Sequence, residues 1–248
     1  INSLLNSQPI TGEQADTTLE VQGLVDAYNK VLAAADGQAD GDPQLSISEY
    51  ASIGLPEVDT AAEQGLLGDV IDVKQLSEVD SHAQLKVLAQ AVSAVTQASS
   101  SQLPTKAQLE QLGIPGLTEQ NLRFAQQAII EHGSPIGSLT ELQSIIAQAL
   151  AIASNALQQL RDAAENSSAT QDTPAADVYQ DAGVDNVSTT NLAAINSALN
   201  LASPSQTFSA EQIQLRVDSY NLLLAGADGN ADNDTALSIQ DYLNIGVT

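Results

Sequence analysis

The sequence contains no cysteine, methionine or tryptophan, and only 3% of its 248 residues are aromatic. Without cysteine the chain can form no disulfide framework, thiolate nucleophile or thiolate metal site. Its two histidines, His82 and His132, exclude a metal site built from several histidines of one chain. No run of about 18 apolar residues occurs, so we expect no membrane insertion.

Basic residues are also scarce, with 7 Lys and Arg against 31 Asp and Glu and a formal net charge of −24. Such a charge repels nucleic acid and anionic membrane surfaces, so we expect no nucleic-acid partner. Hydrophobic residues still make up 43%, which is enough for buried cores, and most are Ala, Leu, Ile and Val. This composition suits closely packed helices. Because the sequence begins at Ile1 without a signal peptide, we read it as an excised part of a longer protein.

The chain repeats itself. Asp26–Gly54 aligns without a gap with Asp218–Gly246 at an offset of 192, and 17 of the 29 aligned positions are identical. A shorter period lies within this one, because short helical segments end in a glycine at intervals of 59, 70 and 63 residues, at Gly54, Gly113, Gly183 and Gly246.

These intervals predict a division into a partial repeat unit (1–44), three full units (45–103, 104–173 and 174–236) and the start of another (237–248). The alternation typical of strands is missing. We therefore predict an all-α fold of three-helix units. Units of about 60 residues are small for independent cores, so we expect them to stack end to end in an elongated array.

Local signals place the three helices of a unit. The first ends at the glycine, as a left-handed C-cap. The second is expected to start after Asp59, Thr118 or Ser188. The third begins with a capping box, Ser/Thr-x-x-Glu/Gln, which occurs four times, at Thr17, Ser81, Ser138 and Ser209.

Two acidic segments, residues 36–50 and 228–242, resemble an EF-hand loop, and each follows a long helix and opens a short one. Calcium takes six to eight oxygen ligands, which alternate positions of a tight loop can supply. The candidate ligands are the first, third and fifth loop residues, an acid in a two-residue insertion, and a closing acid: Asp36, Gln38, Asp40, Asp42 and Glu49, then Asp228, Asn230, Asp232, Asp234 and Asp241. The closing acid is the fourteenth residue here, whereas an EF-hand has it as the twelfth.

An acidic, solvated loop without a metal is the alternative, because Asp, Gly and Asn are ordinary loop residues. Against it, both copies keep acids at the same four positions, and clustered acids repel one another without a cation. The other two junctions lack the pattern, so we expect one calcium ion per 192 residues.

The helix end Tyr-x-x-x-Gly, as in Tyr242 to Gly246, and the segment Val-Ser-x-x-Asn-Leu-Ala-Ala-Ile-Asn-Ser-Ala from Val187 resemble helical repeats of very long bacterial surface proteins. These include RTX-type and biofilm-associated adhesins. The resemblance implies a secreted or cell-surface protein in which calcium at the junctions stiffens a stalk. Its partners would be neighbouring repeat units of the same chain, and also another surface protein or a matrix component.

The first functional hypothesis is therefore a calcium-stiffened spacer of such an adhesin. The alternative is a ligand- or partner-binding module, which an exposed aromatic or arginine patch would mark. We do not expect an enzyme, because the sequence has no nucleophile elbow, phosphate loop or dinucleotide fingerprint.

Overall fold

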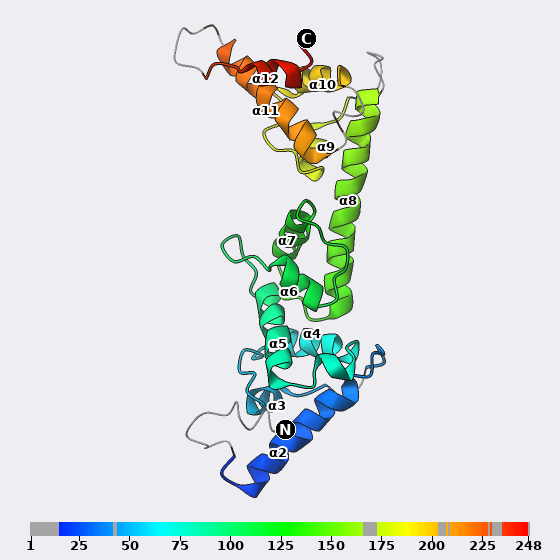
Figure 1. Cartoon of the computed structure of the whole chain (residues 1–248), viewed down its shortest axis with the longest axis vertical. Coiled ribbons are helices and arrows are strands. Elements are labelled where there is room, and N and C mark those ends of the chain that lie inside the picture. Colours follow the sequence, from blue (N-terminus) through cyan, green and yellow to red (C-terminus); the bar gives the residue numbers. More distant parts are fainter. Residues whose placement is uncertain are drawn as a thin grey trace. The chain divides into compact units, whose positions relative to one another are not determined.

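The computed structural model describes residues 15–41, 44–165, 173–202, 207, 209–227, 229 and 235–247. Within these residues all regular elements are helices, which confirms the predicted all-α class (Figure 1). In chain order they are α2 (Thr18–Ala34), α3 (Ile47–Ser52), α4 (Ala61–Asp72), the 3₁₀ turn η1 (Leu76–Glu78), α5 (His82–Thr96), α6 (Lys106–Gln111), α7 (Leu122–Glu131), α8 (Leu139–Glu165), α9 (Ala176–Asp181), α10 (Leu192–Asn200), α11 (Ala210–Gly226) and α12 (Ile239–Asn244).

The chain forms two compact units, and the boundary between Ala147 and Gln148 falls within α8. In unit 1, α4 packs on α5 and α2 packs on α3. In unit 2, α11 packs on both α10 and α12. No described helix is both long and apolar enough to cross a membrane, in agreement with the absence of long apolar runs.

The predicted starts of the long helices are confirmed. Three of them begin directly after a residue that forms both hydrogen bonds of a capping box, namely Thr17, Ser81 and Ser209. At α8 the bonds are arranged differently. Ser138 Oγ accepts from the Glu141 amide at 3.2 Å, whereas Glu141 Oε2 accepts from the Gly137 amide at 2.9 Å, one residue earlier than in a capping box.

The glycines that end the short helices are left-handed as expected, with φ of 81°, 82°, 77° and 91° at Gly54, Gly113, Gly183 and Gly246. In each case the next amide donates to the carbonyl five residues earlier, for example Leu55 to Tyr50 at 3.0 Å. This pattern satisfies a carbonyl at the helix end.

The second helices begin later than the sequence suggested. Thr60, not Asp59, caps α4. The other two expected caps, Thr118 and Ser188, lie one turn before α7 and α10. Each amide donates to an asparagine three residues on: Thr118 to Asn121 Oδ1 at 2.6 Å, and Ser188 to Asn191 Oδ1 at 2.7 Å. The asparagine amides donate back, Asn121 to Thr118 Oγ1 and Asn191 to the Ser188 carbonyl, both at 3.2 Å. This closed turn delays the helix.

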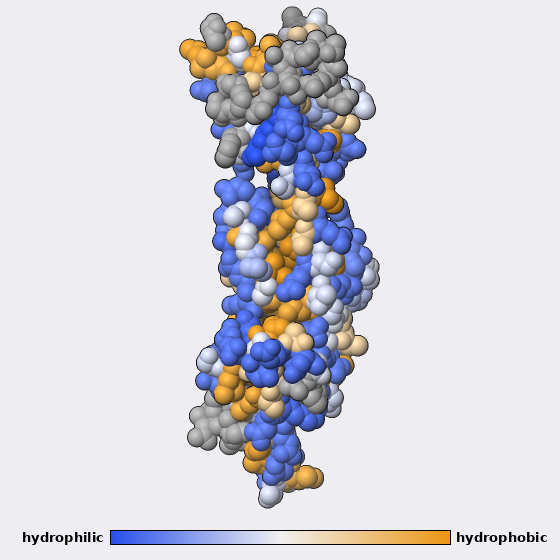
Figure 2. All heavy atoms as spheres, turned by 90° about the vertical axis from the view of Figure 1, so that its right-hand side faces the viewer, coloured by the Kyte–Doolittle hydropathy of each residue, from blue (hydrophilic) through white to orange (hydrophobic). Residues whose placement is uncertain are grey.

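Both units have apolar cores. The core of unit 2 gathers around Tyr179, with Leu160, Ile195, Ile213 and Val217. Full burial of one such aliphatic side chain contributes about 1.5–3 kcal/mol. On the face seen in Figure 2 hydrophilic residues predominate, and apolar residues form patches between them.

A buried carboxylate joins α4 to α5. Glu63 is only 1% exposed. Its Oε2 accepts from the amide and hydroxyl of Thr60, and its Oε1 accepts from Thr96 Oγ1 at 3.1 Å and Gln97 Nε2 at 3.3 Å. Burial raises the pKa of Glu63, but these hydrogen bonds outweigh it, so the pKa lies below its ordinary value.

The 192-residue repeat is visible in the helices. Moving Thr18–Ala34 by 192 positions gives Ala210–Gly226, and moving Ile47–Ser52 gives Ile239–Asn244, which are the observed bounds of α11 and α12. The same local sequence therefore folds into the same pair of helices at both places.

Candidate calcium-binding loop

The first acidic segment connects α2 to α3. Of its candidate ligands, the structure describes Asp36, Gln38, Asp40 and Glu49, whereas Asp42 lies outside the described residues. In the second segment only Asp241 is described, and Asp228, Asn230, Asp232 and Asp234 lie outside.

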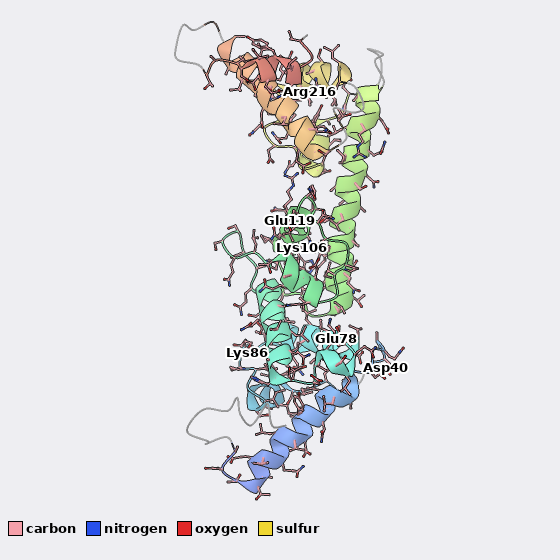
Figure 3. The ribbon with its side chains drawn as sticks, in the orientation of Figure 1. Asp40, Glu78, Lys86, Lys106, Glu119 and Arg216 are labelled. Atoms are coloured by element: carbon pink, nitrogen blue, oxygen red, sulfur yellow. The ribbon has the colours of Figure 1, made fainter. Side chains whose placement is uncertain are left out.

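The loop leaves α2 in two tight turns. Asp36 Oδ1 accepts from the Gln38 amide at 2.8 Å, which is an Asx turn. Gly37 and Gly41 have φ of 84° and 78°, so the sharp turn expected at Gly41 is present. Asp36, Gln38 and Asp40 are exposed, and Asp40 is labelled in Figure 3.

The two closing acids lie in capping boxes. Glu49 Oε2 accepts from the amide and the hydroxyl of Ser46, both at 2.8 Å, and its Oε1 pairs with Lys30. The Lys30 pair and the Ser46 bonds lower the pKa of Glu49 to about 2. Asp241 repeats this arrangement with Ser238, and its Oδ1 accepts from Ser219 Oγ at 3.1 Å. Hydrogen bonds, first among them that from Ser238, also lower the pKa of Asp241.

Within the part of the chain that the structure describes, no three acidic or histidine side chains lie close enough together to hold a metal ion. Asp36, Asp40 and Glu49 therefore do not converge on one point in this structure. The ten ligands expected from the sequence, half of which lie outside the described residues, stay a prediction.

The structure adds a neighbour that the sequence did not indicate, the C-terminal end of α4 and the segment after it. Asp72 Oδ2 accepts from the Gly41 amide at 3.1 Å. Gln44 Nε2 donates to Asp69 Oδ1 at 3.0 Å, and Asp36 forms an isolated bridge with Gln75. The acidic loop thus lies against α4. The only sequence signal was the pair of acids three residues apart at the end of that helix.

Close packing makes this contact specific. A Cβ built on Gly37 would lie 2.0 Å from Gln75 Nε2, so a larger residue would force the Gln75 side chain to move. Leu45, on the other side of the loop, is 2% exposed, and its carbonyl accepts from Gln64 Nε2 at 2.9 Å. The loop is therefore anchored to α4 at both ends.

Unit 1 also has two open depressions. One, of about 440 Å³, lies by η1 and the start of α5 and is lined by Lys74, Glu78 and Gln84 among others. The other, of about 610 Å³, lies between α2 and α3 and includes Glu20, Asp26 and Glu49. Neither lining includes a histidine or a hydrogen-bonded pair of nucleophile and base.

Comparison with known proteins gives no relative: no family model matches the chain, and neither a curated protein nor a solved structure is significantly similar to it.

Proposed function

We propose that the chain is a non-catalytic repeat segment of a large secreted or cell-surface bacterial adhesin, in which it serves as a calcium-stiffened spacer. One observation carries this proposal. The helix pair α2 and α3 recurs with the same bounds 192 residues later as α11 and α12. Recurrent helical units of this kind build extended arrays, in which each unit contacts mainly its neighbours.

The exposed face of α12 supports stacking of units. In the first copy the corresponding residues, Tyr50 and Leu55, are fully buried. In the second copy Tyr242 is 41% and Val247 is 52% exposed. In the first copy this region is contacted from the following segment, since His82 Nε2 lies 3.3 Å from the Gly54 carbonyl. We therefore expect a neighbouring repeat unit to cover α12 in the same way.

Calcium is the ion whose chemistry suits the acidic loops, because it prefers many oxygen ligands in flexible geometry. The loop that joins α2 to α3 carries Asp36 and Asp40 and lies against Asp69 and Asp72 of α4. A cation bound there would neutralise mutual repulsion and hold α2, α3 and α4 together. Bound calcium would thereby stiffen each junction between successive repeat units.

The binding-module alternative receives less support. Arginine and aromatic residues anchor interfaces when they are exposed together. Tyr28, Tyr50 and Tyr179 are buried in the cores, and Arg216 is only 3% exposed. The Arg123 guanidinium lies 4.9 Å from the centre of the Phe124 ring, where it covers that half-buried aromatic.

Calorimetric titration of the chelator-treated 248-residue chain tests the calcium part of the proposal. We expect about two sites, one per acidic loop, and a higher melting temperature with calcium, because a ligand of the native state stabilises it. Absence of binding at millimolar calcium would reduce both loops to solvated connections.

Small-angle scattering tests the stiffening itself. With calcium, Asp36→Ala should change the maximum particle dimension without a loss of helix content, because the variant loosens the junction and leaves the helices folded. Asp80→Ala, which removes an exposed acid after η1, is the matched control. An unchanged dimension for Asp36→Ala would exclude a stiffening role of the ion.

A further inference from the structure

We infer that Asp36, at the start of the acidic loop, is a site of spontaneous covalent modification, in which Asp36 and Gly37 react to form isoaspartate. The loop contains a second Asp-Gly pair, Asp40 and Gly41, which the fold protects from the same reaction. The two pairs are alike in sequence, so only the structure distinguishes them. The inference goes beyond the proposed function, because it does not depend on calcium.

The reaction needs only the protein and water. The Gly37 amide nitrogen attacks Cγ of the neutral Asp36 carboxyl and forms a carbon–nitrogen bond, and the carboxyl hydroxyl leaves as water with the amide proton. Water then adds to the former main-chain carbonyl of Asp36 in the resulting succinimide ring and breaks its bond to the Gly37 nitrogen. The main chain now runs through Cγ, and the former carbonyl carbon is a free carboxylate. Glycine favours the attack, because it has no Cβ to hinder the approach of its nitrogen.

The first pair is arranged for ring closure. Asp36 Oδ1 accepts the Gln38 amide at 2.8 Å, and this Asx turn folds the carboxyl over Gly37. The same Gln38 amide donates to an oxygen on which negative charge develops during the attack, where a donor stabilises the transition state. The attacking Gly37 amide donates no hydrogen bond to any residue that the structure describes. Asp36 is exposed, so water can reach the succinimide.

The second pair lacks these features. The Gly41 amide donates to Asp72 Oδ2 at 3.1 Å, and this bond must break before the nitrogen can attack. Asp72 is only 8% exposed, and a hydrogen bond in such surroundings is stronger than one in water. Asp40 lies at the surface (Figure 3), and among the described residues its carboxyl has no hydrogen-bond partner that would hold it over Gly41.

Conversion of Asp36 would change how the loop contacts the segment after α4. Asp36 forms an isolated bridge with Gln75, and Gly37 lies close to the Gln75 side chain. Isoaspartate inserts a methylene group into the main chain, so the Asx turn is lost and Gly37 shifts along this segment. The opposite expectation is that the bridge holds Asp36 too rigidly to react, in which case both pairs are protected.

The test is a timed incubation of the full 248-residue chain at physiological temperature and mildly acidic pH, with a chelator present throughout. Electron-transfer mass spectrometry of proteolytic peptides locates isoaspartate and gives its rate of formation at each position. In the folded chain we expect formation at Asp36 to be roughly tenfold faster than at Asp40, or more, because a hydrogen bond to a charged group protects Gly41. In concentrated urea the two rates should be similar, since no contact then distinguishes the pairs.

Two variants test the protection by Asp72. Asp72→Ala removes the acceptor of the Gly41 amide and should raise the rate at Asp40 toward the rate at Asp36. Asp72→Asn is the matched control, because its side-chain oxygen can accept the same hydrogen bond. In this variant the rate at Asp40 should stay low.

Each result decides one question. A ratio of the two rates that is the same in the folded chain and in urea would overturn the inference, because the fold would then have no influence. Equally slow formation at both positions of the folded chain would overturn the reactivity of Asp36 and assign protection to the bridge with Gln75. Equal rates at Asp40 in the two Asp72 variants would refute the protective role of Asp72. Should Asp72→Ala not fold, the comparison of the folded wild type with the wild type in urea still decides the outcome.

Discussion

Two buried tyrosines at equivalent positions of the repeat should respond differently to removal of the hydroxyl group. Tyr50 and Tyr179 each lie four residues before the glycine that ends a short helix, and each is 0% exposed. Tyr179 Oη donates to Asn196 Oδ1 at 2.7 Å. Tyr50 Oη has no hydrogen-bond partner among the described residues. Burial raises the pKa of both phenols above its ordinary value.

The structure sets the expected magnitudes. Tyr179→Phe removes a buried hydrogen bond and leaves the 4%-exposed Asn196 without this donor, which should destabilise unit 2 by about 1–3 kcal/mol. Tyr50→Phe removes a hydroxyl that folding has already desolvated without compensation. It should leave unit 1 unchanged or stabilise it by about 1 kcal/mol. Both changes keep the ring, so the packing of the core is the same.

Differential scanning calorimetry of the full chain measures both effects. For a domain of the size of unit 2, Gln148–Thr248, about 1 kcal/mol corresponds to roughly 4–8 °C in melting temperature. We expect a drop of several degrees for Tyr179→Phe, and no drop for Tyr50→Phe. Each variant is compared with the wild-type transition of its own unit. Equal losses in both variants would refute the reasoning, because the hydrogen-bond partner would then not decide the outcome.

Three further predictions concern caps, pH and stacking. Gly54→Ala and Gly113→Ala should each lower the free energy of unfolding by about 1–2 kcal/mol, because alanine disfavours the left-handed backbone. The loss should be larger at Gly54, where a Cβ would lie 2.9 Å from His82 Nε2, and urea unfolding measures the difference. Because the pKa of Glu63 is lowered in the folded state, its contribution is present above about pH 4.3 and is lost as the pH falls through the lowered value. Acid titration followed by circular dichroism should therefore show a smaller pH dependence in Glu63→Gln, which should itself be destabilised by about 1–3 kcal/mol at pH 7. A second copy of residues 55–98, fused after Gly246 in the place that it has after Gly54, should cover α12 and slow the hydrogen exchange of its amides. A scrambled copy of the same residues should not, and equal exchange rates in the two fusions would contradict a repeat interface there.

The sequence predicted those parts of the fold that local chemistry determines. The capping boxes at Thr17, Ser81 and Ser209 set the starts of α2, α5 and α11, because each box satisfies its own amides without help from distant residues. The glycine at position 54 and its equivalents set the ends of the short helices for a similar reason, since the left-handed conformation favours glycine.

Tertiary packing decided what the sequence could not. The apolar pattern of residues 21–35 predicts one buried helix face, made of Val21, Leu24, Val25, Tyr28, Leu32 and Ala35. Leu24, Tyr28 and Ala35 are buried as predicted, whereas Val21, Val25 and Leu32 are half-buried. Ala27 and Val31, which the pattern did not include, are buried beside them.

The acidic loop shows the same division between local and distant determinants. The EF-hand comparison assumes that the ligands come from one continuous segment and that the last acid closes the shell. Glu49 and Asp241 instead occupy the third position of their helices, where a capping box uses the carboxylate. Neither carboxylate can therefore close a calcium shell without giving up its capping bonds. The fold instead brings Asp72 of α4 to the turn at Gly41, 31 residues earlier in the chain, where Asp72 Oδ2 accepts the Gly41 amide. The loop is thus held by a helix that follows it in the chain, a contact that the spacing of acids within one segment does not reveal.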